Sequence, residues 1–76
     1  MTITGVAPQV GDLVRLDQKA SSQFERAIWF RVIGVRPSSA MPGWVYLDGW
    51  ELAEDLEIVE VTVFVRIAGL IIRQDH

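Results

Sequence analysis

The sequence predicts an all-β fold, and three features of the chain carry this prediction. Residues 58–72 form a dense run of β-branched and aromatic side chains, and residues 27–36 form a second run of the same kind. Segments that contain glycine and proline separate such runs. No part of the chain repeats apolar residues with the period of a helix. We therefore expect five or six short strands in one sheet system.

The first half of the chain divides into two strands and two loops. Residues 10–16 read as a turn followed by a short strand, and the polar residues 17–25 read as a long loop. The second strand, 27–36, contains Gly34, which predicts a bulge or a sharp bend. Residues 37–43 form a loop, because their two prolines cannot donate hydrogen bonds to a central ladder.

Asp48-Gly49 is the strongest short hairpin signal in the chain. A type I′ turn needs positive φ at both central residues, and Asp-Gly is a favoured pair there. A turn at this place makes Leu47 and Trp50 oppose each other. Alternation then puts four side chains on the core side of the hairpin, namely Val45, Leu47, Trp50 and Leu52.

The final run follows residues 53–57, which read as one helical turn or a loop, and it is divided in two at Ala68-Gly69. One of its faces carries Val61, Val63, Val65 and Ile67. The other face carries Phe64 between Thr62 and Arg66 and is also partly apolar. A strand of this kind needs cover on two sides, and a short chain has little material to supply it.

A chain of 76 residues has room for one domain with one small core. We expect a single small β-barrel domain over 1–76, with 1–9 as an N-terminal arm and 70–76 as a tail strand. The chain has no cysteine and only one histidine, His76, so neither a disulfide nor a Cys/His zinc site is expected to stabilise it. Efficient packing, oligomerisation or both must take their place.

The sequence contains no pattern typical of secretion or membrane insertion. Residues 1–7 lack a positive n-region and a long apolar h-region. The longest apolar run is far below the ~18 residues that indicate a membrane span. The absence of cysteine fits a reducing compartment. We therefore expect a cytoplasmic protein that has no membrane partner.

Charge is distributed unevenly along the chain, whose net charge is −3. Cations outnumber anions in residues 1–36 and again in residues 66–76. Residues 37–65 contain six carboxylates and no cation, namely Asp48, Glu51, Glu54, Asp55, Glu57 and Glu60. This pattern predicts an acidic side and a mildly basic side, unless the charges only solvate the surface. The acidic total disfavours non-specific binding of nucleic acid, whose affinity comes from phosphate neutralisation.

The opening strand, Val10-Gly-Asp-Leu-Val-Arg-Leu16, is followed by a long loop, a bent second strand, a tight hairpin and a closing strand. This sequence of features resembles the SH3-like small β-barrels of the Tudor or KOW type, over roughly residues 10–67. The resemblance implies a strongly bent barrel of five to six strands that binds peptides, modified side chains or nucleic acid. The chain lacks the acidic and proline-pocket signature of peptide-binding SH3 domains, and it carries an extra apolar tail at 70–72.

The residues offer little support for catalysis. A Ser-His-Asp or Cys-His set is not available, since the lone His76 ends the chain. The six carboxylates of 48–60 are of the type that binds Ca²⁺ or Mg²⁺, but they lack EF-hand spacing, and a solvated acidic face is the favoured interpretation. We expect a protein that is not an enzyme and that needs neither a cofactor nor a metal.

A recurring pattern places an apolar residue two positions before an arginine. Residues two apart share a face of a strand, and arginines of a small domain point outward. The apolar residues of the pattern should therefore point outward as well. The members of this predicted patch are Leu13, Arg15, Trp29, Arg31, Phe64, Arg66, Ile71 and Arg73. Their inward neighbours, which supply the predicted core, include Val14, Leu16, Ile28, Phe30, Val32, Val63, Val65, Ile67, Leu70 and Ile72.

A patch of aromatic, aliphatic and arginine side chains is typical of protein interfaces. The favoured interpretation is a protein-interaction module that binds itself or another protein, unless residues 3–6 or the loop 17–26 cover the patch. The alternative is a nucleic-acid-associated barrel that uses Trp29 and the arginines. Trp44, beside Pro42 and Gly43, is a further candidate for an exposed binding residue, with simple packing as its other interpretation.

Overall fold

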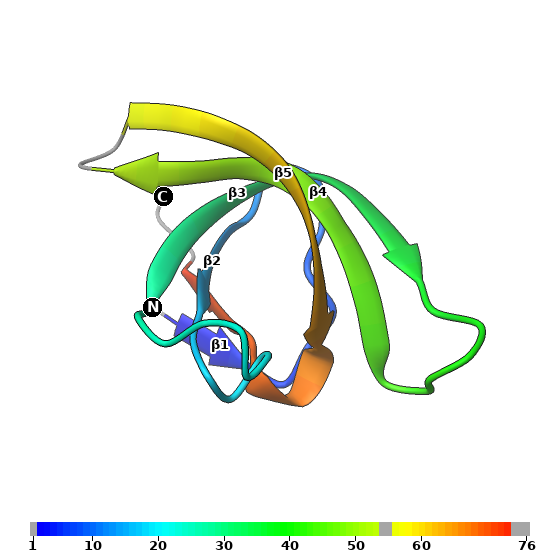
Figure 1. The fold of residues 1–76 in the computed structure, drawn as a ribbon. Helices are drawn as coiled ribbons and strands as arrows, with labels where there is room; N and C mark the ends of the chain where they lie inside the picture. The colour runs from blue at the N-terminus through cyan, green and yellow to red at the C-terminus, as the bar shows by residue number, and fades with distance from the viewer. Residues whose placement is uncertain (1, 54–55, 74–76) are drawn as a thin grey trace.

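The computed structural model is all-β and consists of one antiparallel sheet of six strands. It describes residues 2–53 and 56–73. The elements are β1 (Thr2–Thr4), β2 (Leu13–Leu16), β3 (Ile28–Pro37), β4 (Trp44–Ala53), β5 (Leu56–Arg66), the 3₁₀ helix η1 (Ile67–Gly69) and β6 (Ile71–Arg73). Their order in space is β1-β6-β2-β3-β4-β5 (Figure 1). In the described part of the chain β1 and β5 are the two edges and do not pair, so the sheet is not closed.

The three long strands bend strongly, and the register shows where (Figure 1). Val32 pairs with Gly49 and Gly34 pairs with Asp48, so β3 carries a bulge at Ile33. The bend predicted from Gly34 is therefore confirmed. A second shift lies farther along the β4–β5 pair, where Glu51 pairs with Val59 but Leu52 pairs with Glu57. Bulges increase the twist of a sheet and let a single sheet curl around its own apolar face.

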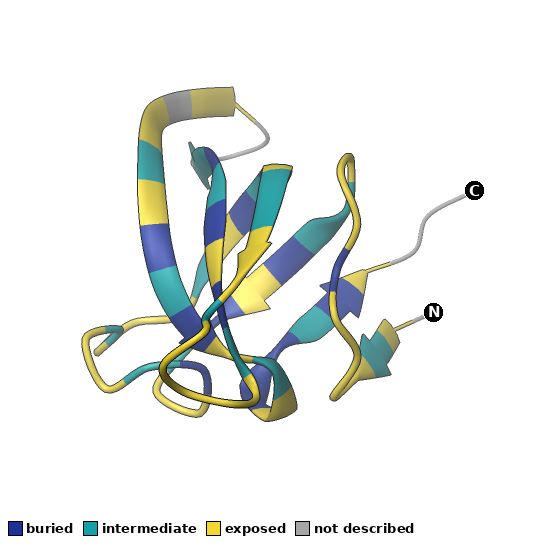
Figure 2. Cartoon of the chain, turned by 90° about the vertical axis from the view of Figure 1, so that its right-hand side faces the viewer, coloured by how far each residue is buried: buried dark blue, intermediate teal, exposed yellow. Residues whose placement is uncertain are grey.

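The concave face of the bent sheet holds the core. Buried and exposed residues alternate along the strands, as Figure 2 shows. The predicted inward positions agree with this alternation, since all of them are buried except Ile28 and Ile67, which are half-buried. The buried apolar residues are Val14, Leu16, Ala20, Phe30, Val32, Val45, Leu47, Val63, Val65, Leu70 and Ile72.

Asp48-Gly49 does not form the predicted hairpin turn. Both residues lie in the middle of β4, which runs without a break from Trp44 to Ala53. Leu47 pairs with Val35 and Val63 and does not oppose Trp50. The chain reverses instead between β4 and β5, whose last pair is Ala53–Leu56. Because Ala53 and Leu56 lie in strands, the predicted alternative of a helical turn at 53–57 is wrong at these two residues.

Gly49 is needed for space, not for a turn. It is buried, and a Cβ atom at this position would lie 2.6 Å from Cε1 of Phe30 and would collide with the carbonyl oxygen of Arg31. The ring of Phe30, which is itself fully buried, fills the space beside the glycine. A glycine inside a strand often marks such a close approach. The glycine that locally predicts a turn is therefore explained by contacts with residues that are distant in the sequence.

The loop 17–27 is fastened to the end of β5. The backbone N–H of Arg66 donates to the carbonyl of Ala20 at 2.7 Å, and its guanidinium donates to the carbonyl of Lys19 at 2.9 Å. Ala20 is fully buried. Gly69 of η1 lies so close to the backbone of Lys19 that no Cβ would fit. The segment predicted to be a long polar loop thus closes one end of the core.

The tail strand is an integral part of the sheet. β6 pairs with β2 through Leu13–Arg73, Val14–Ile72 and Arg15–Ile71. On its other side β6 pairs with β1, which lies within the predicted N-terminal arm. The tail therefore supplies the closing strand next to β2, whereas the sequence placed it beyond the last strand of the fold. No helix within the described ranges has the length and apolar character that crossing a membrane requires.

Asp48 joins the three long strands on the convex face. Its carboxylate accepts two hydrogen bonds from the Arg36 guanidinium, at 2.9 and 3.1 Å, and one from the Thr62 hydroxyl at 2.5 Å. These hydrogen bonds lower the pKa of Asp48 below its usual range, with the one from Arg36 as the largest cause. The same pairing raises the pKa of Arg36. A charge-assisted, two-pronged pair of this kind also fixes geometry beside the bulge of β3.

Gly49→Ala should destabilise the fold, because the added methyl group collides with Arg31 and Phe30. Overpacking of this kind costs about 1–3 kcal/mol of unfolding free energy. Urea titration followed by tryptophan fluorescence measures the change. Ser39→Ala, in the exposed loop 38–43, is the control and should change stability by less than about 0.5 kcal/mol. Equal stability of Gly49→Ala and the wild type would contradict the close approach.

Asp48→Asn should reduce the dependence of stability on pH. The folded state holds the pKa of Asp48 below its unfolded value, so its stabilising contribution is present above the unfolded pKa. That contribution is lost as the pH falls through the folded pKa. Urea midpoints at about pH 7 and about pH 3 test this expectation. Arg36→Met should remove much of the same pH dependence, and the double variant should add little. An unchanged pH dependence in both single variants would contradict the linkage.

Candidate functional site

The convex face of the sheet presents two rows of paired side chains, which we call the outer face. Residues that pair in an antiparallel sheet point to the same side. The first row runs across five strands as Arg73, Leu13, Arg31, Trp50 and Glu60. The second row runs in the same direction as Ile71, Arg15, Trp29, Leu52 and Glu57.

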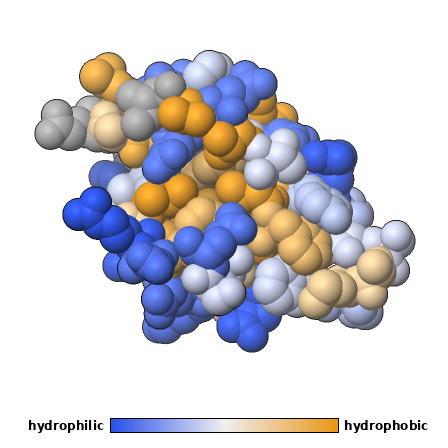
Figure 3. Space-filling model, in the orientation of Figure 1, coloured by the Kyte–Doolittle hydropathy of each residue, from blue (hydrophilic) through white to orange (hydrophobic). Residues whose placement is uncertain are grey.

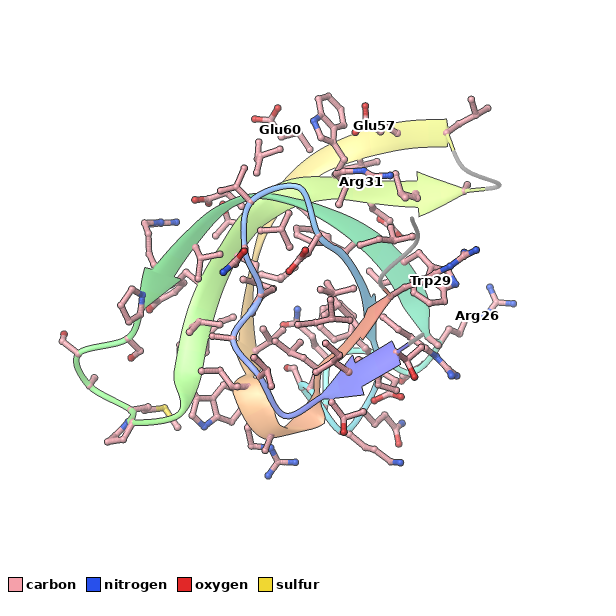
Figure 4. The ribbon with its side chains drawn as sticks, turned by 180° about the vertical axis from the view of Figure 1, so that it is seen from behind. Arg26, Trp29, Arg31, Glu57 and Glu60 are labelled. Atoms are coloured by element: carbon pink, nitrogen blue, oxygen red, sulfur yellow. The ribbon has the colours of Figure 1, made fainter. Side chains whose placement is uncertain are left out.

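The centre of the outer face is apolar and its ends are charged. Trp29 and Trp50 lie on neighbouring strands, and Trp29 is 36% exposed. Arginines occupy the β6, β2 and β3 positions, whereas glutamates end both rows on β5. In Figure 4, Arg31 lies between Trp29 and the two glutamates, and Arg26 lies beside Trp29. Charge therefore changes from positive to negative across a tryptophan-containing centre.

Two contacts orient the arginines of the outer face. The guanidinium carbon of Arg73 lies 5.9 Å from the ring centre of Trp29, which is a cation–π distance. Nη1 of Arg31 donates to the carbonyl oxygen of Gly11 at 3.1 Å. These contacts place the Arg73 guanidinium beside Trp29 and tie that of Arg31 to the backbone of Gly11.

Neither of the two segments considered as covers lies on the outer face. β1 extends the sheet at its edge beside β6. The loop 17–27 packs toward the core, where Ala20 is buried and Phe24 contacts the core cluster. In Figure 4 the segment between β1 and β2 crosses the concavity of the sheet, and Pro8 within it is buried. The described segments therefore leave the centre of the outer face without a second layer.

The structure brings together six of the nine predicted interface residues and separates the other three. The six on the outer face are Leu13, Arg15, Trp29, Arg31, Ile71 and Arg73. The other three lie on the far side of the β3 bulge from the outer face, where the beginning of β4 pairs with the end of β5. They are Trp44, Phe64 and Arg66. Arg66, expected to be a patch residue, holds the loop 17–27 through the Lys19 carbonyl. The predicted single patch is thus two surfaces.

The second surface is an aromatic cluster of Trp44, Tyr46 and Phe64. The rings of Trp44 and Phe64 stack with centres 4.9 Å apart, and those of Tyr46 and Phe64 are 4.7 Å apart. The Arg36 guanidinium lies over Tyr46 at 5.4 Å. Trp44 is half-buried and therefore combines packing with a partly open ring. It also lines a groove of about 440 Å³, together with Pro42, Gly43, Arg66, Ile67, Ala68, Thr4 and Gly5.

Sequence reasoning missed Trp50 and Leu52 as members of the outer face. The prediction of a turn at Asp48-Gly49 assigned both side chains to the wrong face of the sheet, the core side. Both are half-buried and pair with outer-face residues, Trp50 with Arg31 and Leu52 with Trp29. The signal that could have found them is strict alternation through an unbroken strand from Trp44 to Ala53.

The acidic residues of 48–60 do not converge on one site. Glu51 pairs with Phe30 and Val59 on the concave side, whereas Asp48, Glu57 and Glu60 belong to the convex side. Glu54 and Asp55 fall outside the described residues. Within residues 2–53 and 56–73, no group of three His, Cys, Asp or Glu side chains could hold a metal ion. What the outer face offers chemically is apolar area, guanidinium groups and carboxylates.

Comparisons of the chain with protein-family models, with curated proteins and with solved structures gave no match. The interpretation of this outer face therefore depends on its own geometry and chemistry.

Proposed function

We propose that this chain is a non-enzymatic protein-interaction module of the SH3-like small-barrel type, and that it associates with itself through the outer face. The observation that carries the proposal is the tryptophan-containing centre of that face, which the described segments leave without cover. Partly exposed Trp29 pairs with half-buried Leu52 on one side and with Arg15 on the other, and Arg31 lies two residues farther along the same strand as Trp29. Tryptophan and arginine are the residues that most often dominate binding energy at interfaces.

The strand arrangement supports the SH3-like assignment. The strands β2 to β6 lie in the order β6-β2-β3-β4-β5, so the closing strand returns to the side of the opening one. A long loop follows β2, and β3 is bent at its bulge. The long loop and the bent second strand are features on which the resemblance in sequence depends, whereas the closing strand β6 lies outside residues 10–67 and the expected turn at Asp48-Gly49 is absent. The fold names an architecture that hosts many functions, so the function itself is argued from the surface.

The charge pattern suits a symmetric pair of outer faces. We place the two-fold axis along the strands, between β3 and β4. The second copy then lays β4 over β3 and β5 over β2. Trp29 meets Leu52 of the second copy, Arg31 meets its Trp50, and Arg15 meets its Glu57. Self-complementary contacts of this kind are what a two-fold interface requires.

The curvature of the sheet sets the expected strength of association. Two convex faces touch mainly along their centres, where Trp29 and Trp50 lie. A stable interface buries about 800 Å² per partner, roughly one sixth of the 5000 Å² that this chain exposes. A curved face offers less than that in direct contact, so we expect micromolar rather than nanomolar association.

Nucleic-acid binding is the second candidate, favoured by one observation. Arg26 and Arg31 lie on either side of Trp29 in Figure 4, and single strands bind to surfaces that combine cations with stacking aromatic rings. Against it, Glu57 and Glu60 end the same rows, and the net charge is −3. Fluorescence anisotropy with labelled oligonucleotides at low and moderate salt decides the matter, because phosphate contacts weaken steeply with salt.

Trp29→Glu should dissociate the assembly, because it places a carboxylate in the apolar centre. Sedimentation equilibrium from low to high micromolar concentration measures the effect. Met41→Glu is the matched control, since Met41 is an exposed apolar residue of the loop 38–43, away from the outer face. A strictly monomeric wild type, or an oligomer that remains assembled in the Trp29→Glu variant, would contradict the proposal.

A charge exchange should test the arrangement of the two copies. Arg15→Glu should weaken association by up to about fivefold for each of the two symmetry-related ion pairs that it removes. Adding Glu57→Arg should restore it, since the pair reforms with reversed signs. The same sedimentation experiment gives both dissociation constants. Association that is equally weak in the double variant would contradict this axis while leaving the use of the outer face intact.

A further inference from the structure

β5 is an edge strand with a long free side. It spans 11 residues and pairs with β4 along one side. Among the described residues, its other side makes no backbone hydrogen bond until Arg66, whose N–H is taken by Ala20. An edge of this length presents a row of unpaired donors and acceptors to any extended chain. The sequence of β5 contains neither proline nor lysine, two of the residues that commonly protect such edges.

The bond between Arg66 and Ala20 shows which backbone groups face outward. In a strand, the N–H and C=O groups of one residue point to the same edge, and those of the next residue point to the opposite edge. The N–H of Arg66 points away from β4, so those of Phe64, Thr62 and Glu60 point away as well. These three residues lie on the C-terminal side of the bulge, where the register with β4 is regular. They form a template for a short added strand.

The two sides of this edge differ in chemistry. On the concave side, an open groove of about 320 Å³ separates β5 from the loop 17–27. Phe24, Ile28, Val61 and Val63 line its apolar part, and polar side chains of Gln23, Glu25, Arg26 and Glu51 line the rest. In Figure 3, apolar side chains form a band across this side of the molecule. On the convex side, Glu57 and Glu60 stand exposed beside the edge. An added strand would therefore meet apolar surface below and carboxylates above.

We propose that the β5 edge binds an extended segment of another protein in which apolar and basic residues alternate. The segment adds as a seventh strand and donates to and accepts from Glu60, Thr62 and Phe64. Its apolar side chains enter the groove beside Phe24 and Ile28. Its lysines or arginines lie on the convex side, against Glu57 and Glu60. Strand addition gives affinity through the backbone, and the alternate side chains give specificity.

Charge disfavours several of the registers in which a second copy could occupy this edge. Two β5 strands pair antiparallel around a two-fold axis. When that axis passes near the middle of residues 57–61, Glu57 and Glu60 of both copies lie opposite or diagonal to one another, whereas an axis at Thr62 places Glu60 opposite Phe64. Like charges across a strand pair destabilise it. The glutamates therefore disfavour the first group of registers and favour a basic partner, and hydrogen exchange distinguishes that partner from a second copy paired through Thr62.

The probe is a short fluorescein-labelled peptide of alternating valine and lysine, followed by fluorescence anisotropy at low salt. The expected result is saturable binding that weakens as salt increases. A peptide of alternating valine and glutamate should not bind. Two versions of the valine–lysine peptide carry N-methyl groups on alternate backbone nitrogens, and the version that blocks the edge-facing N–H groups should lose binding. Binding of both methylated versions with full affinity would overturn strand addition.

Two variants of the protein separate charge from backbone pairing. Glu60→Gln should weaken binding by up to about fivefold, the effect of one exposed charge. Glu60→Pro also removes an edge-facing N–H that no residue within the described ranges accepts, so the fold should tolerate it while binding is lost. If Glu60→Pro does not fold, the methylated peptides still decide. Unchanged affinity in both variants would contradict the proposal.

The monomeric Trp29→Glu variant makes this test independent of the proposed self-association. The edge lies apart from Trp29, so the peptide should bind this variant as it binds the wild type at protein concentrations below those of self-association, where Glu57 is not paired with Arg15 of a second copy. Amide hydrogen exchange gives the site directly, because the N–H groups of Glu60, Thr62 and Phe64 should become protected on binding. Protection of these amides in the free protein that grows with its concentration would show a second copy on the edge and would overturn the choice of partner.

Discussion

A single sheet that must cover its own apolar face is the constraint on which this structure depends. No second layer of secondary structure packs on the concave side in the described part of the chain, so the sheet has to bend around its core. The bulge at Ile33 and the close approach of Phe30 to Gly49 make this bend possible. The loop 17–27 then closes the end of the core through Ala20.

The bend also determines the shape of the exposed side of the sheet. The core lies on the concave face, so the face toward solvent is convex. The apolar residues of alternate positions that do not enter the core are spread over a curved outer face. Trp29, Trp50 and Leu52 therefore stay half-buried or exposed beside one another. Most of the 76 residues form the sheet itself, and the described segments do not cover the apolar centre of this face. An uncovered apolar patch of this kind is the reason for the proposal that a partner binds there.

Alternation within strands was predictable from sequence, whereas the ends of strands were not. Val14, Phe30, Val63 and their neighbours alternate with a period of two that sequence shows directly, and the core follows from it. Asp48-Gly49 misled the prediction, because a favoured turn pair and a space-limited glycine look the same locally. The deciding contact is with Phe30, 19 positions away in the chain. Arg66 was likewise predicted to belong to the interface patch, but its guanidinium donates to the carbonyl of Lys19 in the loop 17–27. Such contacts depend on the finished fold, which no local pattern contains.

The fastening of Arg66 also determines how the free edge of β5 can be used. Because its N–H is bonded to Ala20, the loop 17–27 is held below the edge and supplies one wall of the apolar groove. The same bond ends the row of unpaired backbone groups at Phe64. Toward the other end, the bulge near Val59 and the glutamates limit which strand can approach. The edge is therefore a site of defined length, with an apolar floor and an acidic rim. The outer face, by contrast, carries arginine and glutamate on the same rows. We therefore propose different partners for the two surfaces, a self-complementary one for the outer face and a basic one for the edge.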